Sequence, residues 1–113
     1  MVTLNGKSVE DRLKHYLERD GLGVRRAVLE LFLQEHIFTT EEVYQHLKNS
    51  GFSVSYRGVS AMVGLMNTRL GIFSIDVTKN HNAYSLKDSY KDIVQLLLSR
   101  KEQPTPISGN VIQ

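Results

Sequence analysis

Apolar residues in the first third of the chain recur at helical spacing. A first helix is predicted from Ser8, an N-cap residue, to the glycine-containing stretch 20–23, which ends it. Its apolar stripe consists of Val9, Leu13, Tyr16 and Leu17. A second helix is predicted from Val24 to His36. Because apolar residues cover most of its surface, we expect it at the centre of the core.

Two arginines fall in the first turn of this second helix. Arg25 and Arg26 occupy positions where the helix dipole disfavours cations by a few tenths of a kcal/mol. Two interpretations follow. The side chains are either ordinary solvated surface or contacts to phosphate groups.

The middle of the chain predicts a helix, a turn, a second helix and a hairpin. Thr39 and Glu42 have the spacing of a capping box, so a helix begins there and ends near Gly51. Ser55 caps the next helix, which runs to Leu70. The inward face of that helix is predicted to hold Val59, Met62, Val63, Met66 and Leu70. Residues 72–78 alternate in polarity and 83–86 return after a turn at 79–82, which predicts a two-stranded hairpin.

A last helix is predicted from Asp88 or Ser89 to Arg100. It holds more apolar residues than one narrow stripe needs. Either it packs back on the first helix, or Ile93, Val94 and Leu97 form a homodimer interface. Residues 1–7 are expected to be a flexible lead and 101–113 a disordered tail, which leaves one domain over 8–100 with a wing at about 72–86.

The order of elements is typical of one DNA-binding architecture. We predict an α+β fold, mainly α: a winged helix-turn-helix with an additional N-terminal helix and a C-terminal helix. In such a domain the second helix of the pair enters the major groove. The outward face of that helix and the hairpin tip supply the candidate DNA contacts: Ser55, Tyr56, Arg57, Ser60, Ala61, Gly64, Asn67 and Thr68 from the helix, and Lys79 and His81 from the wing.

Small residues on the predicted groove-facing side permit close approach to bases. Gly64 has two interpretations, since a mid-helix glycine costs about 1 kcal/mol relative to alanine. It permits close approach to DNA or a partner helix, or it eases packing inside the domain.

Charge follows the same division of the chain. The net charge is only +2, but residues 52–87 hold four Lys or Arg and one Asp, whereas residues 27–51 hold one Lys and four Glu. Positive charge therefore falls on the elements predicted to face DNA, as attraction to phosphates requires.

Other function classes find little support in the composition. The chain has no cysteine, which excludes disulfides, thiolate zinc sites and a cysteine nucleophile. It has neither an apolar run of about 18 residues nor a secretory signal, so a cytoplasmic protein without membrane contact is expected. No catalytic motif is present, and we expect neither an enzyme nor a bound cofactor. His36 and His46, with Glu35 or Glu42, are the one metal-ligand combination considered; surface histidines are the favoured interpretation.

Several capping and core positions also carry a family resemblance. They are Thr40-Glu41-Glu42-Val43, Leu47, Gly51, Val54-Ser55, Val59 and Leu65-Met66. This pattern, under half of the chain, resembles the winged-helix DNA-binding domains of the ferric uptake regulators and arginine repressors. The resemblance implies DNA binding by the helix from Ser55. The chain departs from both families at Ala61, where they commonly place an arginine, and lacks their effector domains.

The chain as a whole, with its stretch 21–26 and its trailing helix, is also similar to a small uncharacterised family of archaeal, mostly methanogen, proteins. That resemblance implies a winged helix and assigns no activity. The first hypothesis is therefore a double-stranded-DNA-binding transcriptional regulator, dimeric, with the helix from Ser55 to Leu70 in the major groove. The alternative is a winged-helix protein-protein interaction adaptor without sequence-specific DNA binding. A small-molecule or metal sensor is the third.

Overall fold

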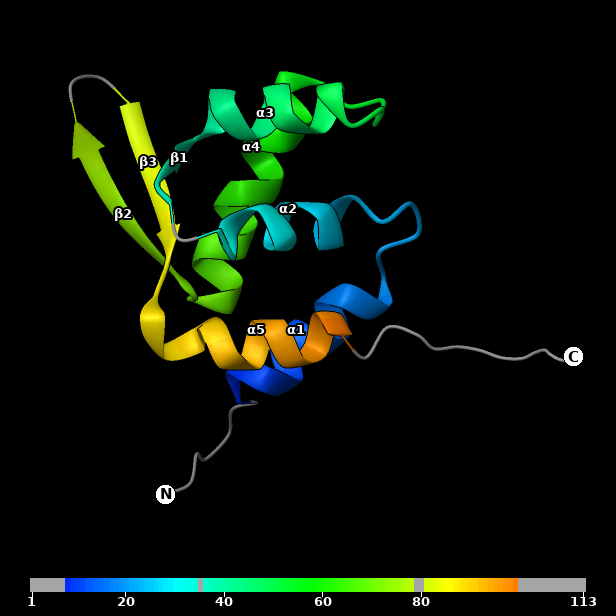
Figure 1. Cartoon of the computed structure of the whole chain (residues 1–113), viewed down its shortest axis with the longest axis vertical. Coiled ribbons are helices and arrows are strands. Elements are labelled where there is room, and N and C mark those ends of the chain that lie inside the picture. Colours follow the sequence, from blue (N-terminus) through cyan, green and yellow to red (C-terminus); the bar gives the residue numbers. More distant parts are fainter. Residues whose placement is uncertain (1–7, 35, 79–80, 100–113) are drawn as a thin grey trace, which may run out of the picture.

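The computed structural model describes residues 8–34, 36–78 and 81–99 (Figure 1). The fold is α+β and mainly helical, as predicted. Its helices are α1 (Val9–Glu18), α2 (Val24–Phe32), α3 (Thr40–Asn49), α4 (Tyr56–Leu65) and α5 (Lys91–Ser99). Its strands are β1 (Phe38–Thr39), β2 (Phe73–Thr78) and β3 (His81–Leu86). A π-helical turn, η1 (Met66–Leu70), continues α4, and a 3₁₀ turn, η2 (Asp88–Tyr90), precedes α5.

The helices form two levels. Helices α2, α3 and α4 pack together in the upper part of Figure 1, and α1 and α5 lie side by side beneath them. The hairpin of β2 and β3 stands along one side of the upper helices (Figure 1). Helix α1 also contacts η1, so the two levels meet at the end of α4.

The predicted starts of α1, α3 and α4 are confirmed, since each has a local side-chain cap. The last helix begins at Lys91, because the predicted start at Asp88 or Ser89 lies in the 3₁₀ turn η2. The Ser8 hydroxyl accepts from the Asp11 amide at 3.1 Å, and the Ser55 hydroxyl accepts from the Gly58 amide at 3.0 Å. At α3 the full capping box is present: Thr39 Oγ1 accepts from the Glu42 amide, and Glu42 accepts from the Thr39 amide at 2.9 Å. Caps of this kind contribute about 1 kcal/mol each.

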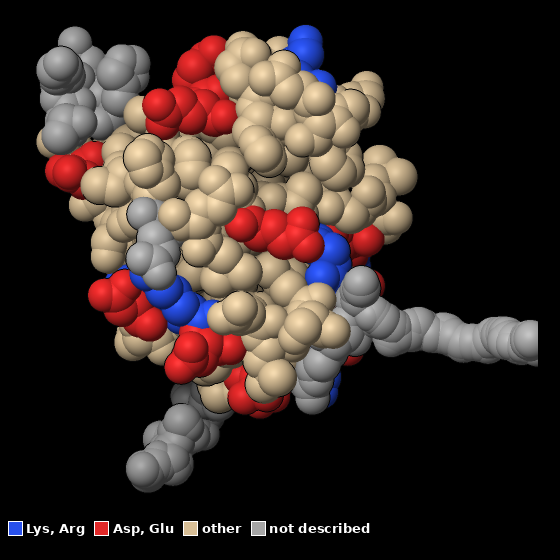
Figure 2. Space-filling model, viewed as in Figure 1, with Lys and Arg blue, Asp and Glu red and all other residues tan. Residues whose placement is uncertain are grey.

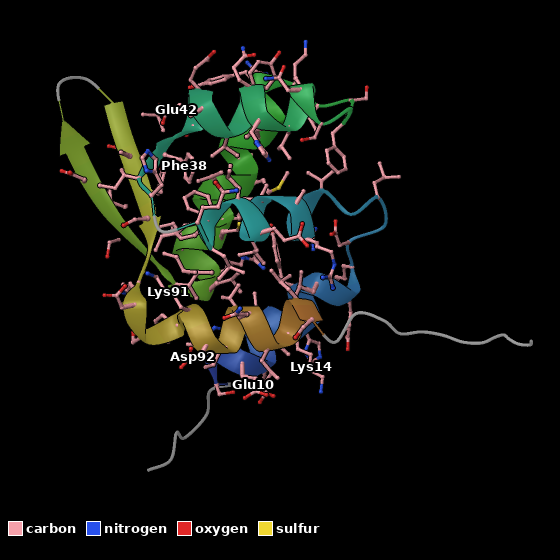
Figure 3. The ribbon with its side chains drawn as sticks, viewed as in Figure 1. Glu10, Lys14, Phe38, Glu42, Lys91 and Asp92 are labelled. Carbon is pink, nitrogen blue, oxygen red and sulfur yellow. The ribbon has the colours of Figure 1, made fainter. Side chains whose placement is uncertain are left out.

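The second helix is shorter than predicted, and strand β1 follows it. That helix ends at Phe32, not at His36, and the chain then becomes extended. The sheet order is β1-β3-β2, all antiparallel, with Phe38 opposite Tyr84. Phe38 points toward α2 (Figure 3), where the centre of its ring lies 5.4 Å from the centre of the Phe32 ring. The pairing with β3 and this aromatic contact select the extended conformation, and both partners come from other elements.

The hairpin turn is also shorter than predicted. Thr78 pairs with His81 and Val77 with Asn82, so β3 begins at His81. Phe73 is buried, but Ile75 and Val77, which lie on the same face of the strand at steps of two residues, are 45% and 67% exposed. Because strands twist, the outer half of the hairpin leaves the core that its base covers.

The core is centred on α2, as predicted. The largest fully buried side chains are Phe32, Leu13, Leu29, Leu47, Met66, Ile72, Val28, Val43, Val59, Val63 and Val94. Every helix contributes at least one of them. Phe32 also lies 4.5 Å from the ring of Phe73 and so joins α2 to the sheet.

Helix α5 packs back onto this core. Val94 is fully buried, Leu97 is 6% exposed and Ile93 is half-buried against the core cluster. Of the two alternatives for this helix, the structure shows packing against the chain itself, which covers the side chains of Val94 and Leu97. A homodimer stays a prediction that these contacts do not test. On this helix Leu96 is the large apolar residue that is exposed, at 52%.

The two arginines of α2 link it to its neighbours. Asp20 accepts from the amides of Arg25 and Arg26 at 3.0 and 2.9 Å. Its carboxylate is favoured by the dipole at this helix N-terminus, where the cationic arginine side chains are disfavoured. Arg25 Nη1 donates to the Tyr16 carbonyl at 2.8 Å, and its guanidinium lies 4.2 Å from the Tyr16 ring centre. Arg26 Nη1 donates to the Leu98 carbonyl of α5. Neither side chain is ordinary solvated surface.

The environment of Tyr16 also affects its ionisation. Burial raises the pKa of the Tyr16 phenol above its ordinary value, Arg25 opposes that shift, and Asp20 adds to it.

No helix within the described ranges has both the length and the apolar character that crossing a lipid bilayer requires.

Candidate nucleic-acid interface

Helix α4 has a sharply divided surface. Val59 and Val63 of α4 and Met66 of η1 are fully buried in the core, on the side where α4 contacts α3. The predicted contact residues lie on the other side: Ser55, Tyr56, Arg57, Ser60, Ala61 and Thr68 are exposed, and Gly64 and Asn67 are half-buried. The structure thus brings together on one helix face the eight residues that the helical spacing selected.

This face has no acidic side chain. Residues 55–70 contain Arg57 and Arg69 and neither Asp nor Glu. The opposite side of the molecule differs. On the face drawn in Figure 2, acidic side chains lie over α3 and around α5 and α1 with basic side chains among them, whereas α4 runs behind α3 and α2 (Figure 1). A polyanion approaching α4 therefore meets cations and small neutral side chains.

The N-terminal end of α4 is held against α3 by an aromatic contact. The rings of Tyr44 and Tyr56 are 5.8 Å apart and nearly perpendicular, and Lys48 Nζ lies 5.6 Å from the Tyr44 ring centre. Tyr56 remains 48% exposed. The contact fixes the angle between the helices and leaves about half of the Tyr56 surface for a partner.

Gly64 lies in open space on this face. An added Cβ would meet no described atom within 4 Å, apart from the turn of helix to which Gly64 belongs. The interpretation that this glycine eases packing inside the domain is therefore wrong. Thr68 Oγ1 donates to the Gly64 carbonyl at 3.1 Å. Because its hydrogen is used in this bond, the hydroxyl can only accept a hydrogen bond from a partner.

Two residues on the same side were missed by the sequence prediction. Leu65 is 48% exposed, and Arg69 is exposed in η1. Leu65 was assigned with Met66 to an apolar pair, although steps of four residues lead from Ala61 to Leu65 and Arg69 and signal a shared face.

The C-terminal end of this helix is fixed by distant side chains. Arg12 of α1 donates through Nε to the Arg69 carbonyl at 3.1 Å and through Nη2 to the Leu70 carbonyl at 3.4 Å. Lys87 Nζ donates to the Gly71 carbonyl at 3.4 Å, where the chain turns with φ of +67°. These donors satisfy carbonyls that a helix end leaves without partners. Helix α1 therefore anchors the end of the candidate interface.

Less can be placed on the β2-β3 hairpin, which the sequence predicts to be a wing. Lys79 lies outside the described residues. His81 is placed only as the first residue of β3, opposite Thr78. Nearer the base of the hairpin, Ile75, Asp76 and Val77 of β2 are exposed.

Comparison with known proteins places the chain in a family. A family model described as a protein of unknown function, DUF2551, matches residues 13–94. The chain belongs to the DUF2551 family. The DUF2551 match begins within α1 and ends within α5, so it includes all of α4, η1 and the hairpin.

A relative of this DUF2551 protein occurs in Archaeoglobus fulgidus. It is 46% identical over 99 residues, which are 88% of this chain and all of the relative, and is described as an uncharacterized protein. No solved structure matches the chain. The chain was predicted to resemble an archaeal family, and this relative is an archaeal protein. The descriptions of the family and of the relative assign no activity.

In the part of the DUF2551 chain that the structure describes, no three histidine or carboxylate side chains are placed to hold a metal ion. The ring of His36 instead lies 5.2 Å from that of Phe38.

Proposed function

We propose that this DUF2551 protein is a winged helix-turn-helix that binds double-stranded DNA and acts as a transcriptional regulator. The observation that carries the proposal is the exposed face of α4. It has no carboxylate, and it presents Arg57, Ser60, Ala61 and Gly64 in succession. A major groove accepts a helix of this kind, since small side chains let the backbone approach the bases.

The order of elements supports the proposal. Helix α2, strand β1, helices α3 and α4 and the β2-β3 hairpin follow one another as in a winged helix. In that arrangement α4 is the recognition helix and the hairpin is the wing. Helices α1 and α5 are additions, and α1 secures the end of α4 through Arg12.

Arg57 is the residue expected to distinguish base contacts from phosphate contacts. It is exposed in the first turn of α4 and is the one cation among residues 55–68. A guanidinium that pairs with guanine in two hydrogen bonds contributes about 1–3 kcal/mol of discrimination. A guanidinium that contacts phosphate contributes evenly on all sequences.

Salt dependence tests the proposal. If about four phosphates are contacted, raising the salt from about 50 to 200 mM should lower the affinity for random duplex DNA about 100-fold. An Arg57→Ala/Lys79→Ala variant should bind more weakly, with a reduced salt slope. Absence of binding at the lower salt would refute the proposal for this chain.

A protein-interaction adaptor is the second candidate, and exposed apolar side chains favour it. Leu65 borders the α4 face, and Ile75 and Val77 project from the wing, all at 45% exposure or more. Contacts of this kind bury apolar area and respond weakly to salt. Binding of a partner protein that persists at about 200 mM salt, without DNA binding at about 50 mM, would favour the adaptor.

A further inference from the structure

A hollow lined by arginines lies between α1, the start of α2 and the end of α4. Its volume is about 490 Å³. Pockets that hold small ligands have volumes of about 300–1,000 Å³. The basic residues that line it are Arg12, His15, Arg19, Arg25 and Arg69. No carboxylate lines it among the residues that the structure describes.

The arginines converge because of the fold and not because of their sequence positions. Arg12 lies in α1 and Arg19 is the residue that ends this helix, whereas Arg69 comes from η1. Arg12 joins the two elements through the Arg69 and Leu70 carbonyls. Arg25 enters from α2 through its bond to the Tyr16 carbonyl.

The four guanidinium groups differ in what holds them. Arg12 and Arg25 are half-buried and fixed by backbone carbonyls. Arg19 and Arg69 are exposed, and their side chains form no hydrogen bond or ion pair with the described residues. The nearby Asp20 uses its oxygens on the amides of Arg25 and Arg26. Arg19 and Arg69 therefore face the hollow as cations, and their mutual repulsion falls when an anion enters.

The chemistry of the donors indicates which anion. A guanidinium offers a planar fork of N–H groups that matches two oxygens of a phosphate. Tyr16, Leu65 and Leu70 supply apolar walls beside the cations. A tetrahedral anion with several charged oxygens can accept from more than one arginine at once.

We propose that this hollow binds a phosphate group, with Arg12 and Arg25 as its fixed wall and Arg19 and Arg69 as its mobile donors. Two sources supply that chemistry: a free phosphorylated small molecule, or a backbone phosphate of DNA beside the C-terminal end of α4. The proposal does not depend on base recognition by α4, because no residue of the hollow is among the predicted base contacts.

The test uses the full chain and single variants that leave the anchors in place. Arg19→Gln and Arg69→Gln each remove one exposed guanidinium. Lys14→Gln is the matched control: Lys14 is exposed on α1, does not line the hollow and lies on the outer side of the helix (Figure 3). Thermal unfolding verifies that all variants fold. Inorganic pyrophosphate and random duplex DNA are titrated separately at low salt.

Each outcome is informative. Pyrophosphate binding that weakens about tenfold in Arg19→Gln and Arg69→Gln, but not in Lys14→Gln, supports the proposal with a small ligand as the source. The same pattern with DNA alone supports it with the DNA backbone as the source. Binding of neither anion by the unmodified chain, or an equal loss in Lys14→Gln, overturns it. DNA binding that depends on Arg57 but not on Arg19 or Arg69, together with no binding of pyrophosphate, overturns this inference and leaves the proposed function standing.

Discussion

Two pairs of arginines in this molecule have opposite surroundings. Arg25 and Arg26 of α2 donate to the carbonyls of Tyr16 and Leu98, and Arg25 also covers the Tyr16 ring. The side chains of Arg57 and Arg69, on α4 and η1, form no hydrogen bond or ion pair with the described residues. The first pair joins helices of the same domain, whereas the donors of the second pair are not used within the described part of the chain.

The comparison shows that residue type and position in a helix do not determine a cation's role. Arg26 and Arg57 both lie in the first turn of a helix. Arg26 meets a carbonyl of α5, because α5 packs across α2. Nothing in the described part of the domain packs over Arg57. Substitutions should therefore affect stability in one case and binding in the other.

The largest effect is expected for Arg57→Ala on DNA affinity. Loss of a base or phosphate contact should cost about 1–3 kcal/mol of binding free energy. The free energy of unfolding should stay the same or rise by a few tenths of a kcal/mol, because a cation leaves the helix N-terminus. Fluorescence anisotropy on preferred and scrambled duplexes measures the first quantity, and urea unfolding measures the second.

Arg57→Lys is the control for that experiment, since it keeps the charge and loses the planar fork. Recovery on all sequences would indicate a phosphate contact. A loss confined to one preferred sequence would indicate base recognition. Unchanged DNA affinity in Arg57→Ala would show that Arg57 makes no contact to DNA and would refute the contrast drawn with Arg26.

Arg26→Ala should show the opposite pattern. The charge-assisted hydrogen bond to the Leu98 carbonyl is lost, so unfolding should become easier by about 1.5 kcal/mol. DNA affinity should be unchanged at a temperature where the variant is folded. A variant of unaltered stability and weakened DNA binding would assign Arg26 to the binding surface instead.

A smaller effect, of both kinds, is expected for Gly64→Ala. The added Cβ meets open space, so helix propensity should raise the unfolding free energy by about 0.5–1 kcal/mol. DNA affinity should fall if the backbone approaches the groove at Gly64. Gly71→Ala is the matched control, since its φ of +67° predicts a destabilisation of about 1–2 kcal/mol. Stabilisation without loss of binding would exclude close approach at Gly64.

The smallest effect concerns Tyr16, the ring that Arg25 covers. The pKa of Tyr16 is raised by burial, above 10.0 for the free side chain, so folding favours the neutral phenol. Its contribution to stability is therefore complete below about pH 10 and declines as the pH rises through the folded-state pKa. Urea unfolding at about pH 8 and 11 should show a smaller decline for Tyr16→Phe than for the unmodified chain. Equal declines would show that Tyr16 makes no such contribution.

Much of the candidate interface follows from helical spacing alone. Once Val59 and Val63 face the core, Ser60, Ala61 and Gly64 must face outward, because successive residues turn by about 100°. The same spacing pointed to Leu65 and Arg69. Leu65 was missed because its apolar character assigned it to the core.

Local hydrogen bonds explain why the sequence by itself determined where α1, α3 and α4 begin. Ser8, Thr39 and Ser55 each accept from an amide three residues ahead, so each cap lies within its own segment. The inward stripes and the coarse fold class follow from the same local order. Both depend on residues that are neighbours in the chain.

Only the tertiary structure decided the features that join distant segments. Strand β1 exists because Phe38 and Thr39 pair with β3. Val94 and Leu97 of α5 are buried, because α1 and α2 cover that helix. The arginine hollow forms where α1 meets η1. Partners so far apart leave no trace in the spacing of apolar residues, since each segment satisfies its own helical pattern whichever neighbour it meets.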